Sequence, residues 1–197
     1  MPEAQLLDRL LTVVETEIVP RTRAGVAAGN KIFGAAILRK SDLSLVVAES
    51  NKETENPLWH GEVHALKAFY ELPGKLRPAT SECLFLSTHE PCSLCLSAIT
   101  WSGFDNFYYL FSHEDSRDSF AIPHDLRILK EVFRLEPGGY ARENAFWKSY
   151  RLKELAVESG AGERAGFSAR IEALERTYAE LSRAYQDVKA HTEIPLK

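Results

Sequence analysis

The chain has 197 residues, of which 45% are hydrophobic and 26% charged, with a formal net charge of −4 and a pI near 5.9. This ordinary globular composition suits one domain with a sizeable core, and it is not that of an obvious polyanion-binding protein. No apolar run approaches the roughly 20 residues of a membrane span, and the acidic N-terminal segment does not resemble a signal peptide. We therefore predict a cytoplasmic protein.

Hydrophobic periodicity predicts alternating helices and strands in the first 111 residues. The predicted elements are, in chain order, a helix over 2–19 that ends at Pro20, strands at 31–38 and 43–49, a helix within 59–72, a strand at 82–87, a helix from Pro91 through Trp101, and a strand at 104–111. This order indicates an α/β layered domain with a partly parallel sheet.

The pattern is weaker after residue 112, where helices are predicted over 122–133 and 144–155 and the fifth strand of such a sheet has no assigned position. Apolar residues spaced four and three apart from Phe167 to Val188 predict a long helix over 163–190 with a heptad seam. So narrow a stripe should pack on one partner, either its own domain or a second subunit. We expect a catalytic domain at 1–157 and a helical extension at 158–197.

The cysteines of the chain are Cys83, Cys92 and Cys95. An odd number of cysteines in a reducing compartment, two of them in a C-x-x-C pattern, favours metal or redox chemistry over a disulfide framework. Cys83 lies within a predicted strand, where a free cysteine packs as a small hydrophobic residue.

The segment from His60 to His64 places two histidines four residues apart on a predicted helix, as in helical zinc proteases. The order His-Gly-Glu-Val-His puts Glu62 about 100° away from the position that a protease glutamate occupies. The protease interpretation therefore fails, and it would leave the C-x-x-C pair unexplained.

His60 combined with Cys92 and Cys95 makes a better metal site. Pro91 begins a helix, so the two sulfurs lie on one face of its first turn, where free N–H groups and the helix dipole favour thiolates. Three protein ligands leave tetrahedral zinc one open position, as catalytic sites do. We predict one zinc ion per chain, bound by these three residues, with Glu62 beside it to collect a proton from zinc-activated water.

His-x-Glu followed by Pro-Cys-x-x-Cys is the pattern of zinc-dependent nucleobase deaminases. Over roughly residues 31–111 the chain resembles the cytidine-deaminase-like superfamily, including the order of its elements. It looks most like the guanine deaminase and tRNA adenosine deaminase branch, through Asn51, Pro57 and the segment Glu90–Cys95. It departs from that branch at Trp59, where a small residue is usual, and at Gly61, which replaces a common alanine.

The resemblance implies a three-layer α/β/α domain with a mixed five-stranded sheet, a C-terminal helical extension and a homodimer. It implies hydrolytic deamination of a small aminated N-heterocycle, a nucleobase or nucleoside with a guanine-like ring favoured. Zinc-bound hydroxide would attack the amino-bearing ring carbon, and Glu62 would shuttle the proton. The candidate substrate-binding residues are Asn51 through hydrogen bonds, Phe33, Trp59 and Trp101 through stacking, and Asp115 through the edge of the base. Each also has a structural interpretation as a turn, core or loop residue.

Two alternatives stay open on the sequence. A tRNA adenosine deaminase would use the same chemistry on RNA, and the local basic cluster is Arg142, Lys148, Arg151 and Lys153. The acidic pI counts against this alternative. A zinc-stabilised interaction module without catalysis would assemble through the heptad helix, but Glu62 and a metal site with three protein ligands argue against it.

Overall fold

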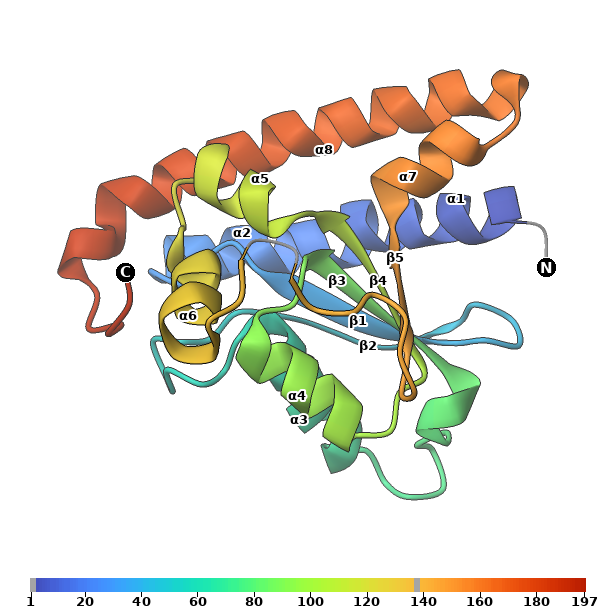
Figure 1. Cartoon of the computed structure of the whole chain (residues 1–197), viewed down its shortest axis with the longest axis horizontal. Helices are drawn as coiled ribbons and strands as arrows, with labels where there is room; N and C mark the ends of the chain where they lie inside the picture. The colour runs from blue at the N-terminus through green and yellow to red at the C-terminus, as the bar shows by residue number, and fades with distance from the viewer. Residues whose placement is uncertain (1–2, 137–138) are drawn as a thin grey trace.

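The computed structural model describes residues 3–136 and 139–197 and contains a five-stranded sheet with helices on both faces (Figure 1). The strands are β1 (Gly34–Arg39), β2 (Leu45–Ser50), β3 (Cys83–His89), β4 (Asn106–Phe111) and β5 (Lys148–Arg151), in the spatial order β2-β1-β3-β4-β5. β1 is antiparallel to β2 and β3, whereas β4 is parallel to β3 and β5. The predicted mixed sheet and three-layer fold are confirmed.

Helices cover the two faces of the sheet in separate groups, with α1, α2, α7 and α8 on one face and α3 and α4 on the other (Figure 1). The helices are α1 (Glu3–Val13), α2 (Val19–Ala27), α3 (Gly61–Glu71), α4 (Ser93–Trp101), α5 (His113–Asp118), α6 (His124–Phe133), α7 (Leu152–Glu158) and α8 (Ala161–Val188). Within the described ranges no helix has both the length and the apolar character to cross a membrane. The cytoplasmic location stays a prediction.

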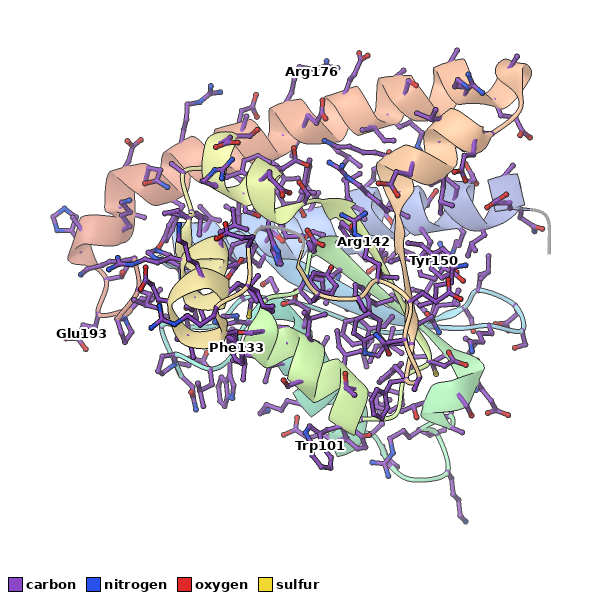
Figure 2. The ribbon with its side chains drawn as sticks, viewed as in Figure 1. Trp101, Phe133, Arg142, Tyr150, Arg176 and Glu193 are labelled. Carbon is purple, nitrogen blue, oxygen red and sulfur yellow. The ribbon has the colours of Figure 1, made fainter. Side chains whose placement is uncertain are left out.

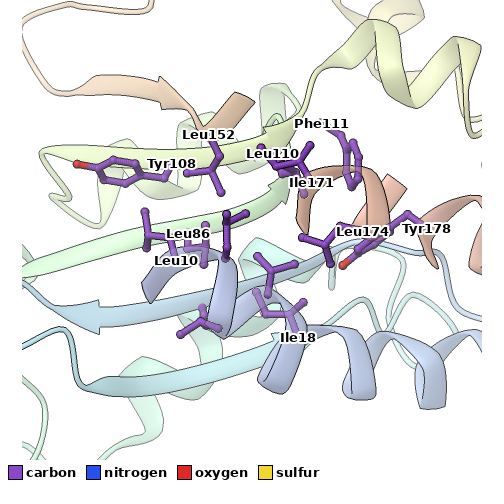
Figure 3. Close-up of a cluster of buried hydrophobic side chains, with 14 of the residues drawn as sticks. Leu10, Ile18, Leu86, Tyr108, Leu110, Phe111, Leu152, Ile171, Leu174 and Tyr178 are labelled. Atoms are coloured by element: carbon purple, nitrogen blue, oxygen red, sulfur yellow. The ribbon is translucent and has the colours of Figure 1, made fainter. Parts of the chain in front are cut away.

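Alternate strand residues divide between two hydrophobic cores, because successive side chains of a strand point to opposite faces. In β3, Leu84 and Leu86 belong to the first core, with α1, α7 and α8, part of which Figure 3 shows. Cys83 and Phe85 belong to the second core, with α3 and α4. Cys83 is therefore a buried packing residue.

The heptad seam of α8 packs on its own chain. Its buried residues, Phe167, Ile171, Leu174, Tyr178, Leu181 and Tyr185, lie in the first core. Helix α8 contacts α1, α2 and α7, so the long helix closes one face of the sheet. The domain boundary after residue 157 stays a prediction.

The N-terminal helix does not end at Pro20, contrary to the sequence prediction. A π-helical turn over Val14–Ile18 joins α1 to α2, and the Val19 amide donates to the Val14 carbonyl. Pro20 then occupies the first turn of α2, where a missing N–H leaves no hydrogen bond unmade. The helical segment therefore continues to Ala27.

The predicted helix over 144–155 is also wrong in its first half, because β5 lies there. β5 pairs in parallel with β4 at the edge of the sheet, from Asn106 opposite Lys148 to Tyr109 opposite Arg151. Only four residues long and largely polar, β5 carries little of the alternating pattern that marks a strand. Helix α7 begins directly after it.

Candidate active site

Two helix N-termini meet where β2 and β3 end. Both strands run antiparallel to β1, so the segments that follow them leave from the same end of the sheet. The segment after β2 leads to His60, the N-cap of α3, and the segment after β3 leads to Cys92, the N-cap of α4. Candidate ligands more than thirty residues apart in the sequence are thereby brought together.

His60, Cys92 and Cys95 are positioned to bind a metal ion, with ligand atoms that all lie within 4.8 Å of one another. The two sulfurs are 3.6 Å apart, and His60 Nδ1 lies 3.4 Å from Cys92 Sγ and 3.6 Å from Cys95 Sγ. Tetrahedral zinc, with bonds of about 2.3 Å to sulfur and 2.0–2.1 Å to nitrogen, requires separations of roughly 3.6–3.8 Å. The donor set and its spacing therefore fit zinc.

The thiols of the site have opposed acidities. The pKa of Cys92 lies well below its usual value, because Cys92 forms a hydrogen bond with Cys95 and lies next to His60. Burial raises the pKa of Cys95. Burial alone would lower the pKa of His60, but the hydrogen bond and charge of Cys92 raise it to about 9. A lowered pKa at Cys92 favours its thiolate form, which is the form that binds a metal ion.

Glu62 is buried next to this group. The Ser87 hydroxyl donates to Glu62 Oε1 at 2.8 Å, and the Cys95 thiol donates to Glu62 Oε2 at 3.3 Å. Burial raises the pKa of Glu62. A carboxyl group with a raised pKa, fixed by one hydroxyl, is suited to exchange protons near neutral pH.

A cavity of about 270 Å³ opens onto His60 and Cys92. Phe33 lines this cavity and also a smaller one of about 10 Å³, which reaches Glu62 and Cys95. The inner space is close to the size of one water molecule. The larger cavity has the proportions of a small-molecule site, with apolar walls and a few polar groups.

Four segments of the chain complete the wall of the larger cavity. Lys31 and Glu53 come from the segments before β1 and after β2, Asp125 comes from the first turn of α6, and the C-terminal residues Pro195 and Leu196 close the wall. Desolvation in the cavity, and then the charge of Cys92, raise the pKa of Asp125 to about 7. Asp125 had no sequence signal beyond that of an ordinary acidic residue in a first helical turn.

Of the five candidate substrate-binding residues, only Phe33 lines the cavity in the described part of the chain. Asn51 is buried behind the wall, where its amide donates to Glu53. Trp59 stacks on His64, with ring centroids 5.9 Å apart.

Trp101 and Asp115 lie elsewhere. Trp101 is 91% exposed and points outward from the end of α4 (Figure 2). Asp115 lies in the first turn of α5, accepts from the backbone N–H of the N-cap Ser112, and forms ion pairs with Arg151 at 2.9 Å and Lys153 at 3.3 Å. Asp115 therefore lies outside the larger cavity, which Asp125 lines.

A three-layer α/β/α fold with a His/Cys/Cys group and a buried glutamate defines the class of zinc-dependent deaminases. Residues 13–111 match the model of the cytidine and deoxycytidylate deaminase zinc-binding region. A guanine deaminase of Bacillus subtilis is 31% identical over 110 residues, which are 55% of this chain and 67% of that protein. The chain belongs to this deaminase family and is a hydrolase that acts on C–N bonds.

Solved structures share the fold. A guanine deaminase from Nitrosomonas europaea is 20% identical, with a TM-score of 0.51 over 89% of this chain and 85% of that one. A mutant protein in complex with 8-azaguanine is 21% identical, with a TM-score of 0.55 over 92% of this chain and 84% of that one. At this level of identity the likeness supports the architecture alone.

Replacing a member of the His/Cys/Cys group should remove the metal. We expect wild-type protein to carry about one zinc per chain, and His60→Ala and Cys92→Ser to lose most of it, because two donors bind zinc far more weakly than three. Zinc content is measured by atomic emission on protein purified without chelator. Cys83→Ala is the matched control and should keep its zinc; equal loss in that variant would contradict the assignment.

Proposed function

We propose that the protein hydrolyses the exocyclic amino group from a small N-heterocycle, with a guanine-like free base as the favoured substrate. The observation that carries this proposal is the position of Glu62, a carboxyl group that is not among the three candidate ligands and lies at 3.3 Å from one of them. A purely structural zinc site needs no such group and would usually have a fourth protein ligand.

Zinc, when bound by His60, Cys92 and Cys95, supplies the Lewis acidity that brings the pKa of a water molecule close to neutral. Glu62 takes up the proton at Oε2, delivers it to a ring nitrogen of the substrate, and then assists the departure of ammonia. Ser87 holds Glu62 Oε1, so the other oxygen stays directed at the reacting groups. Phe33 and the apolar walls exclude bulk water.

The cavity favours a free base over a nucleotide. Its volume of about 270 Å³ lies below the range of roughly 300–1,000 Å³ that holds drug-sized ligands. Among the described residues that line it, Lys31 has the only lysine or arginine side chain, and its ammonium group already pairs with Glu53. Little positive charge is left for a phosphate group.

Asp125 is the carboxyl group we propose for reading the edge of the heterocycle. It lines both the larger and the inner cavity, so it faces any ring that reaches the His/Cys/Cys group. A carboxylate accepts hydrogen bonds from ring N–H groups, which guanine offers and adenine lacks in the six-membered ring. The similarity to a curated guanine deaminase supports the same preference.

The RNA alternative loses its main support, because the basic cluster is neutralised by neighbouring acids. Arg142 pairs with Glu154 at 3.4 Å and Lys148 with Glu143 at 3.3 Å. The other two members pair with Asp115, as described above. Basic side chains held in such pairs present little free charge to a phosphate backbone.

We also propose a homodimer, formed through the outer face of α4. Leu94 and Trp101 are seven residues apart, so they share one face of this helix, and they are 37% and 91% exposed. A tryptophan so exposed on an apolar helix face is typical of an association surface. The heptad seam of α8, which the sequence offered as an interface, is occupied within the chain.

Removing the carboxylate of Glu62 should abolish turnover but not metal binding. We expect Glu62→Gln to lower ammonia release by about 10²–10⁴-fold, the usual contribution of a general acid–base group, with zinc content unchanged. Ammonia is measured with guanine, guanosine, adenine, adenosine, cytosine and cytidine. Exposed Glu55 gives the control variant Glu55→Gln. Substantial activity in Glu62→Gln would refute the proposed role.

Asp125→Asn should weaken recognition of the ring. The amide cannot accept hydrogen bonds at both of its ends, so we expect kcat/KM for guanine to fall by about 10- to 100-fold, as for loss of a charged hydrogen bond. Zinc content and thermal stability should stay unchanged. Asp118→Asn, at an exposed position of α5, is the control. Equal kcat/KM in the two variants would exclude Asp125 from the substrate site.

Placing a charge on the outer face of α4 should dissociate the dimer. We expect wild-type protein to have the mass of a dimer by light scattering, and Trp101→Glu to have that of a monomer, because a buried unpaired carboxylate is strongly unfavourable. Val157→Glu, at an exposed apolar position of α7, should stay dimeric. A monomeric wild-type protein, or a dimeric Trp101→Glu variant, would contradict the proposal.

A further inference from the structure

A buried ion pair lies beside the candidate metal site. Lys31 Nζ and Glu53 Oε1 are 2.9 Å apart, and the two side chains are only 4% and 3% exposed. A buried pair gains little net stability, since the cost of removing two charges from water offsets their attraction. Both residues line the larger cavity. Their burial therefore calls for a role other than stability.

The carboxylate of Glu53 is held from a second side by Asn51. The Asn51 amide donates to Glu53 Oε2 at 2.6 Å, and its carbonyl oxygen accepts from the backbone N–H of Glu53 at 3.1 Å. Asn51 is fully buried, so this arrangement is rigid. Both of its polar ends are thereby engaged with Glu53, which explains why Asn51 does not line the cavity.

The Glu53 oxygen that pairs with Lys31 also faces the ring of His60. Glu53 Oε1 lies 3.7 Å from His60 Nε2, while the other ring nitrogen, Nδ1, faces the two sulfurs. A neutral imidazole that binds a metal through Nδ1 must carry its proton on Nε2. In that tautomer the protonated nitrogen is the one that lies 3.7 Å from the Glu53 carboxylate.

We propose that Glu53 is a positioning residue that orients His60 for metal binding, with Lys31 and Asn51 holding its carboxylate in place. Carboxylate acceptors behind a metal-binding histidine fix the tautomer and ring orientation and raise the basicity of the ligating nitrogen. Lys31 compensates the charge of Glu53, which would otherwise add to that of Glu62 and the thiolate of Cys92. The inference rests on the metal site of the proposed function, and not on the choice of substrate.

Metal affinity tests this proposal directly. Zinc affinity is measured by competition with a chromophoric chelator, and the visible absorption of Co(II)-substituted protein reports the geometry of the ligands. We expect Glu53→Gln to bind zinc about 10- to 100-fold more weakly than wild type, the usual effect of losing such a partner, and to alter the Co(II) spectrum. Glu55→Gln, two residues further in the same loop and exposed, should match wild type.

A double variant separates positioning from folding. Glu53→Gln alone leaves Lys31 buried without a partner, whereas Lys31→Met combined with Glu53→Gln leaves no unpaired charge. We expect the double variant to fold and still to bind zinc at least 10-fold more weakly than wild type. Wild-type affinity and an unchanged Co(II) spectrum in the double variant would overturn the proposal. Absence of zinc binding by wild-type protein would instead overturn the proposed function.

Discussion

The contact between the start of α3 and the start of β1 determines the positions of the candidate catalytic groups. A Cβ atom added to Gly61 would lie 2.8 Å from both Cα and N of Gly34, a distance that no side chain tolerates. Glycine at position 61 therefore lets the first turn of α3 rest on the backbone of β1. His60 and Glu62 flank this glycine, so the same contact sets both the candidate ligand and the candidate proton shuttle against Cys92 and Cys95.

The directions of the strands and the course of the C-terminal segment position the other residues of the site. Because β2, β3 and β4 run in the same direction, the segments that follow them lie at the same end of the sheet, where these strands end. Helix α8 runs along the helical layer that contains α1 and α2, and it brings the C-terminus to that end of the sheet, beside α6 (Figure 1). Ile194 is buried there, and Pro195 and Leu196 face the cavity. The long terminal helix thus contributes both to the core and to the enclosure of the site.

Local patterns allowed the His/Cys/Cys group and most of the sheet to be predicted. The candidate ligands follow from short spacings at helix starts, and β3 and β4 follow from short apolar runs, whose length and aromatic or β-branched content favour buried strands. The failures have physical causes of their own. The helix does not end at Pro20 because this proline lies in the first turn of α2, after a π-helical turn, where it is tolerated. β5 was missed because a short polar edge strand carries little alternating pattern. Asp125 and Glu53 reach the site through tertiary proximity, which spacing along the chain does not reveal.

We propose that three protein donors bind zinc and leave the fourth position for the oxygen of a water molecule. X-ray absorption at the zinc edge of the zinc-bound protein in solution measures the ligand atoms directly. The structure predicts two sulfur ligands near 2.3 Å and two nitrogen or oxygen ligands near 2.0–2.1 Å, only one of which belongs to an imidazole. A shell with two imidazoles, or with three or more sulfurs, would mean a zinc site closed by the protein and would exclude an open catalytic position.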